Sequence, residues 1–214
     1  MGVVGRERVV LWMDPLCPWS WLTAEWLLEV QQQAVGEPDG GLQIDWHVMS
    51  LSILNEGPDT PEEWREFVRM AWGPVRALEA ARQHDPETFV PLLRAIARRW
   101  HVDGRRDAST VIAEAVAEVG LPASVADVAW TDDLDEDVRL SHKRAMALGG
   151  DDVGSPILSF VRSDGEQVGH YGPIISRVPR GEEAVRMFDA VRTLVTTPGF
   201  FELKRTRDEE PWLE

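Results

Sequence analysis

The chain has 214 residues, 43% of them hydrophobic, which predicts one large domain, with or without an insertion, around a core of ordinary size. Its net charge of −15 argues against nucleic acids and anionic membranes as partners, because both bind basic surfaces. The lack of a long apolar run, a signal-peptide pattern and a second cysteine predicts a cytoplasmic protein without a membrane span or an internal disulfide.

The first fifty residues predict a strand, a helix and a second strand. Residues 9–13 form a short apolar run, and residues 21–33 are typical of a helix. From residue 42 to residue 48 apolar and polar side chains alternate, which marks a half-buried strand. Two consecutive strands joined by a helix usually lie side by side in parallel, and we expect that arrangement here.

The middle of the chain is predicted to be helical. Thr60 and the proline and glutamates after it form a capping box, and Gly73-Pro74 should break or kink the helix that follows. A second helix should start at Asp85-Pro86 and run to about residue 100. An apolar stripe then predicts a helix that ends at Gly120, and a further helix is expected over residues 135–148.

Strand character returns near the C-terminus. Residues 156–161 and 167–171 flank Ser163-Asp164-Gly165, which favours a hairpin. A last amphipathic helix follows, and the tail from Thr197 is expected to pack back on the domain. The helical block between two sheet-forming ends predicts an insertion, with the sheet domain formed by residues 1–57 and 150–214 and the insertion by residues 58–149.

Cys17 is the only cysteine, and it lies in the tetrapeptide Cys17-Pro18-Trp19-Ser20, where the first strand gives way to the first helix. A lone cysteine is often a buried and inert small hydrophobe. Here the amides and dipole of the helix start favour the thiolate. The flanking prolines fix the backbone, and the hydroxyl of Ser20, one turn along, can stabilise a negative sulfur. These features make Cys17 a candidate nucleophile.

Besides Cys17, the sequence offers few candidate functional residues. The five histidines are scattered without ligand spacing, so no metal site is predicted, and no phosphate-binding glycine loop is present. Arg177 and Arg180 lie in a loop before the last helix, where they serve either helix entry or the binding of an anionic or polar ligand. Four of the ten tryptophans lie around the cysteine: Trp12, Trp19, Trp21 and Trp26.

Several segments together carry a resemblance to known proteins. They are Asp14-Pro15-Leu16-Cys17-Pro18-Trp19, His47-Val48-Met49-Ser50-Leu51, Ile53-Leu54-Asn55-Glu56, Ala71-Trp72-Gly73-Pro74-Val75-Arg76, Val153-Gly154-Ser155-Pro156, Gly172-Pro173, Ser176-Arg177, Pro179-Arg180-Gly181-Glu182-Glu183-Ala184 and Phe200-Phe201-Glu202-Leu203-Lys204-Arg205-Thr206-Arg207. With these segments the chain resembles the DsbA family of thioredoxin-fold proteins and, more narrowly, the mycothiol-dependent nitroreductases of actinobacteria.

The resemblance implies an α/β, thioredoxin-like fold with an all-helical insertion. It implies that Cys17 is the nucleophile and that Pro156 is a cis-proline facing it. The cosubstrate would be mycothiol or another low-molecular-weight thiol, the substrate a disulfide or a nitroaromatic compound, and no metal is needed; a homodimer is left open. Residues expected to bind thiol or substrate are Pro18, Trp19, Trp21, Ser155, Arg177 and Arg180.

Ser20 departs from the family pattern, in which a second cysteine normally stands at this position. Serine cannot resolve a mixed disulfide, so the protein is either a natural monothiol variant that relies on an outside thiol or an engineered Cys-to-Ser trap. Two other functions share the fold. One is an enzyme like glutathione transferase kappa or an isomerase, which only activates a bound thiol, and the other is a non-enzymatic protein that binds an aromatic ligand.

Overall fold

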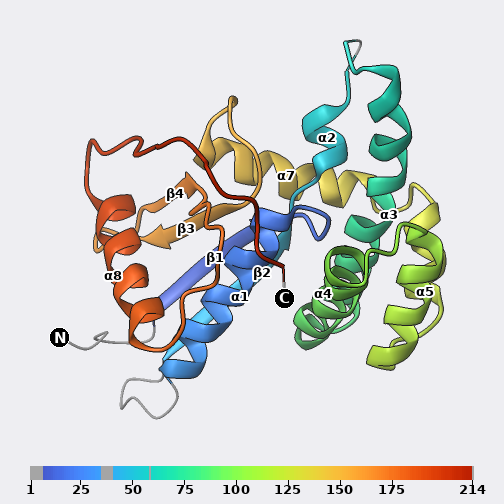
Figure 1. Cartoon of the computed structure of the whole chain (residues 1–214), viewed down its shortest axis with the longest axis horizontal. Coiled ribbons are helices and arrows are strands. Elements are labelled where there is room, and N and C mark those ends of the chain that lie inside the picture. Colours follow the sequence, from blue (N-terminus) through green and yellow to red (C-terminus); the bar gives the residue numbers. More distant parts are fainter. Residues whose placement is uncertain (1–6, 35–40, 58, 214) are drawn as a thin grey trace.

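A computed structural model describes residues 7–34, 41–57 and 59–213 of the chain. It contains a four-stranded sheet with the strand order β2-β1-β3-β4 (Figure 1). Strands β1 (Glu7–Met13) and β2 (Leu42–Val48) are parallel, as predicted. Strands β3 (Ile157–Val161) and β4 (Gln167–Tyr171) form the predicted hairpin, and β3 lies antiparallel to β1. The two ends of the chain therefore build one sheet.

Helices cover both faces of this sheet. Helix α1 (Pro18–Gln33) and helix α8 (Glu182–Thr196) pack together on one face, and helix α7 (Asp135–Gly149) contacts all four strands. The alternation of side chains along β1 explains the two layers. Leu11 belongs to the main core with α1 and α8, whereas Trp12 belongs to a smaller cluster with residues of α7.

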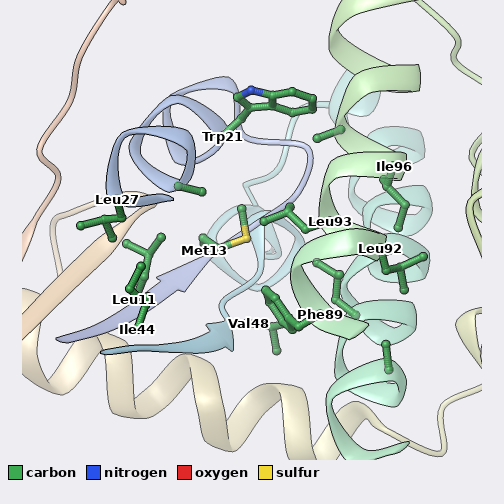
Figure 2. Close-up of a cluster of buried hydrophobic side chains, with 14 of the residues drawn as sticks. Leu11, Met13, Trp21, Leu27, Ile44, Val48, Phe89, Leu92, Leu93 and Ile96 are labelled. Atoms are coloured by element: carbon green, nitrogen blue, oxygen red, sulfur yellow. The ribbon is translucent and has the colours of Figure 1, made fainter. Parts of the chain in front are cut away.

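The remaining helices form a block beside the sheet. It consists of α3 (Glu62–His84), α4 (Phe89–Ala97), α5 (Ala108–Val119) and the four-residue α6 (Ser124–Asp127), with a 3₁₀ turn η1 (Pro86–Thr88), a π-helical turn η2 (Arg98–Val102) and a 3₁₀ turn η3 (Val128–Trp130). Figure 2 shows how Phe89 and Leu93 of α4 reach toward Val48 and Met13 at the ends of β2 and β1. A continuous apolar core thus joins the helical block to the sheet. The domain boundaries at 57 and 149 stay a prediction.

Two sequence signals in the helical block mark helix termini where they were expected. Asp85 caps η1 by accepting the amide of Glu87, and α5 ends where Gly120 takes a left-handed φ of 79°. A positive φ of this size is nearly free for glycine and strained for other residues.

Two other expectations for the helical block differ from the structure. Gly73-Pro74 was expected to break or kink the helix, and the break is wrong, because α3 runs without interruption to His84. The glycine is needed for packing, because a Cβ at Gly73 would lie 2.8 Å from the Trp130 ring. The capping box does not form either: Pro61 is the N-cap, and the Thr60 hydroxyl instead donates to the carbonyl of Asn55.

Sequence periodicity also missed the short helix α2 (Leu51–Asn55), which the side chain of Ser50 caps. The C-terminal tail packs back on the domain as expected, with Phe200 stacked on His170 and the Trp212 amide donating to the carbonyl of Ser176 over 2.8 Å. Among the described residues no helix has both the length and the apolar character that crossing a bilayer requires.

Candidate active site

Cys17 occupies the N-cap position of α1, directly after β1 and a short turn. Its amide donates to the carbonyl of Asp14 over 3.1 Å, and its carbonyl accepts the amide of Trp21 over 3.1 Å. Pro18 fills the first helical position, where its missing N–H costs nothing. The residue Cys17 is only 5% exposed, so the thiol lies just below the surface of the protein.

The two residues directly before β3 lie beside the thiol. The Ser155–Pro156 peptide bond is cis, which confirms the expected cis-proline. The Cys17 thiol donates to the carbonyl of Ser155 over 3.4 Å. Cys17 and Pro156 are thus neighbours although 138 residues separate Cys17 from Ser155. A second cis bond, Gly172–Pro173, was not predicted from the sequence.

Two buried hydroxyls lie beside the sulfur. Ser20 and Ser155 are 0% and 3% exposed, and their Oγ atoms are 2.6 Å apart. Ser155 Oγ also accepts the amide of Asp14 over 3.3 Å. When the Ser155 hydroxyl donates to Ser20, the Ser20 hydroxyl is left to donate to Cys17, whose thiolate it stabilises. With the hydroxyls oriented in this way, a chain of hydrogen bonds leads from the Asp14 amide through Ser155 and Ser20 to the sulfur.

Burial nevertheless raises the pKa of Cys17. The Ser20 hydroxyl and the amides of Ser20 and Trp19 act in the opposite direction, and the carboxyl group of Asp14 adds to the increase. From the sequence, the helix start and the Ser20 hydroxyl were expected to favour the thiolate, and both do so, but the net shift of the Cys17 pKa is upward. The helix amides do favour the thiolate, but removal of water from the sulfur outweighs them.

Asp14 is a buried acid that the sequence analysis did not select. Its carboxylate accepts the amides of Leu16, over 2.8 Å, and Leu51, over 2.7 Å, and so joins the turn before Cys17 to the start of α2. Burial raises the pKa of Asp14 to about 7, against the effect of these two hydrogen bonds. An acidic residue directly after a buried strand and three positions before the cysteine was the available signal.

Three further side chains near the cysteine were also missed. His101 contacts the carbonyl of Pro15 over 3.0 Å and the edge of the Trp21 ring, and burial lowers its pKa to about 4, so it is neutral at pH 7. The guanidinium of Arg207, from the tail, lies 5.5 Å from the centre of the Trp19 ring. Burial raises the pKa of Tyr171, the last residue of β4. Arg207 lies in one of the segments that carry the family resemblance, but no role was assigned to it, and His101 and Tyr171 lie outside those segments.

The remaining predicted residues meet in a different place. Arg177 and Arg180 line a cavity of about 540 Å³ together with Trp21, one turn beyond Cys17 on α1. The structure therefore divides the predicted site in two: Cys17, Ser20, Ser155 and Pro156 surround the sulfur, and Trp21 and the arginines surround the cavity. Within the part of the chain that the structure describes, no group of three or more His, Cys, Asp or Glu side chains could hold a metal ion.

Comparison with known proteins agrees with this geometry. A family model described as the mycothiol-dependent nitroreductase Rv2466c matches residues 16–205. The chain belongs to this family. It is also 27% identical to the uncharacterized protein Rv2286c of Mycobacterium tuberculosis over 91% of this chain and 80% of that protein. The family and the fold support an oxidoreductase.

Solved structures show the same fold. The cytosolic disulfide reductase DsbM from Pseudomonas aeruginosa has a TM-score of 0.56 and 21% identity, with 86% of this chain and 98% of that chain covered. A probable DsbA oxidoreductase, SCO1869 from Streptomyces coelicolor, has a TM-score of 0.57 and 15% identity, with 95% of each chain covered. The predicted DsbA-like thioredoxin fold with added helices is confirmed.

Proposed function

We propose that this protein is a cytoplasmic oxidoreductase that works with one protein sulfur, Cys17, and takes its second sulfur from mycothiol or another low-molecular-weight thiol. The observation that carries the proposal is the buried triad of Cys17, Ser20 and Ser155 beside the cis-proline Pro156. A hydroxyl stands where a resolving thiol would be needed. The cytosol is the compartment in which such thiols are kept reduced.

The exchange reaction then needs two attacks on sulfur. The Cys17 thiolate attacks a disulfide, one sulfur of which leaves as a thiolate while the other stays bonded to Cys17. An outside thiol, as thiolate, attacks this mixed disulfide, releases a new disulfide and restores Cys17. In both steps the Ser20 hydroxyl stabilises the Cys17 sulfur when it carries charge, as nucleophile in the first and as leaving group in the second.

Nitroaromatic reduction also uses Cys17 and an outside thiol, which together supply two electrons. The Cys17 thiol and one outside thiol each give one electron and one proton to the nitro group, which becomes a nitroso group and water. The two sulfurs join as a mixed disulfide, which a second outside thiol resolves. Burial of Cys17 suits this step, because a thiol that keeps its proton can deliver the proton and the electron together.

The test compares the wild-type protein with the variant Ser20→Cys, each treated with mycothiol disulfide and measured by intact mass. The wild type should accumulate one mycothiol adduct per chain, because Ser20 cannot displace it. The variant should lose the adduct, because the thiol introduced at position 20 displaces mycothiol and forms an internal disulfide with Cys17. Wild type without any adduct at Cys17 would contradict the proposal. Ser159→Ala, a substitution of another buried serine on β3, is the control and should behave like the wild type.

A further inference from the structure

The cavity beside Trp21 lies apart from the hydrogen-bonded triad. It has a volume of about 540 Å³, within the range typical of small-molecule sites. It is formed by α1, α4 with the η2 turn that follows it, α5, the loop before α8 and the C-terminal tail. Figure 1 shows the end of the tail between α1 and α4, which agrees with the position of Trp212 in the cavity wall. Segments that are distant in sequence therefore contribute to one cavity.

The cavity is cationic although the protein is strongly acidic. Its lining contains four arginines and two glutamates, in a chain with a net charge of −15. The arginines are Arg94, Arg98, Arg177 and Arg180, and the glutamates are Glu25 and Glu118. Two of the four guanidinium groups are neutralised at close range. Arg94 makes two hydrogen bonds to Glu25, of 2.7 and 2.8 Å, and Arg180 contacts Glu29 over 3.1 Å.

The other two arginines, Arg98 and Arg177, are not neutralised at close range. No ion pair joins Arg98 to any residue that the structure describes, and the carboxylate of Glu118 is directed to Arg99 over 2.6 Å. Arg177 lies 3.8 Å from Glu209, a long contact between two exposed side chains. Exposed pairs of this kind are weak, so an incoming anion can compete for Arg177. Arg98 and Arg177 are therefore the two arginines of the lining that no close carboxylate neutralises.

The walls of the cavity favour a flat ring. Trp21 comes from α1, and Trp212 from the tail, where its amide is fixed to Ser176 and its ring lies 4.6 Å below the guanidinium of Arg177. Indole faces stack on aromatic ligands and hold cations at the same time. The Trp21 amide donates to the Cys17 carbonyl, so one edge of the cavity is one helical turn from the thiol.

We propose that this cavity binds an aromatic anion, with the ring between Trp21 and Trp212 and the negative group at Arg98 and Arg177. The inference rests on the proposed function, for which it names the substrate class: nitroaromatic compounds that carry a carboxylate or a similar acidic group. Neutral nitroaromatics of the same size would make the ring contacts and leave both guanidinium groups without an anionic partner.

The test measures binding by calorimetry in a Cys17→Ala background, where no thiol chemistry can occur. The probes are 4-nitrobenzoate and its neutral counterpart 4-nitrobenzyl alcohol. We expect 4-nitrobenzoate to bind at least about ten-fold more tightly, as charge-assisted hydrogen bonds predict. Arg98→Ala and Arg177→Ala should each remove roughly ten-fold of that affinity. Arg186→Ala, a substitution on α8 outside the cavity, is the control and should change nothing.

Equal binding of the two probes, or an equal loss in the Arg186→Ala variant, would overturn the inference. The failure of the proposed function would look different. In that case 4-nitrobenzoate would bind as expected and depend on Arg98, but wild-type protein would form no thiol adduct at Cys17. Normal adduct formation without selective binding of the anion would overturn the substrate class alone.

Discussion

The two ends of the first turn of α1 lie in opposite environments. At the N-cap, Cys17 is buried among neutral hydroxyls, and its charged form is disfavoured by burial. One turn later, Trp21 borders an arginine-lined cavity that attracts negative charge. In our proposal this contrast separates chemistry from recognition: burial and hydrogen bonds set the protonation of the sulfur, and the arginines set which ligands bind beside it. The predictions below test that separation.

The largest effect is expected from Cys17→Ala. This substitution removes the only sulfur nucleophile, so thiol-coupled turnover should fall by at least about three orders of magnitude, to background. Binding of 4-nitrobenzoate should stay close to that of the wild type, because the cavity residues are unchanged. Steady-state kinetics and calorimetry on the same preparation check both parts. Turnover that survives the substitution would contradict the role of Cys17.

Asp14 should make the protein less stable as the pH rises. The folded protein keeps the Asp14 proton up to about pH 7, whereas the unfolded chain releases it near the ordinary value of 3.8. The unfolded state therefore binds fewer protons between these values, and the free energy of unfolding falls as the pH rises through them, by about 4 kcal/mol at most. Urea titrations at pH 4, 5.5 and 8 measure this slope.

Asp14→Asn should remove most of that slope and also lower the pKa of Cys17, because the carboxyl group of Asp14 raises it. Asp152→Asn, at an exposed position, is the control and should keep the wild-type slope. A variant Asp14→Asn with an unchanged slope would show that another group titrates in this range.

A smaller effect is expected from Ser20→Ala. Loss of the hydroxyl that donates to the sulfur should raise the pKa of Cys17 further and slow its alkylation at pH 7 by roughly ten-fold. Ser155→Ala should shift the pKa in the same direction by less, since it only frees the Ser20 hydroxyl to turn. The pH profile of iodoacetamide labelling measures both shifts. Identical profiles in Ser20→Ala and Ser159→Ala would rule out the hydrogen-bonded chain.

The smallest effect is one of salt. Raising the ionic strength from about 0.05 to 0.5 M should weaken 4-nitrobenzoate binding a few-fold, because the arginine charges are partly exposed and screened. The labelling of Cys17 by neutral iodoacetamide should not change over that range, because the sulfur and its hydroxyl partners are buried. Parallel changes in the two measurements would show that recognition and reactivity are not separate.

The strands and the position of Cys17 at the start of the first helix could be predicted because their signals are local. The alternation from Leu42 to Val48 and the place of Cys17 at a strand-to-helix junction depend on a few neighbouring residues. The packing of the Trp130 ring on Gly73 inside the continuous helix α3 could not be predicted, because these residues meet only in the folded chain. The same holds for Asp14, whose partners Leu16 and Leu51 meet only in the folded chain.

The pKa of Cys17 shows the limit of local reasoning most clearly. The helix start was visible in the sequence, but burial beneath Ser155 and Pro156 was not, because it needs a contact between residues 138 positions apart. The family resemblance supplied Pro156 as the cis-proline. It did not supply the cavity, whose wall includes Trp212 from the last residues of the described chain.

The central claim is that Cys17 bonds to an outside sulfur during turnover. The most direct measurement is rapid acid quenching during nitroaromatic reduction with reduced mycothiol, followed by intact-mass analysis and peptide mapping. The account predicts a transient adduct of one mycothiol per chain, confined to Cys17, that forms and decays at the rate of turnover. Turnover at the full rate with Cys17 unmodified at every time point would contradict it.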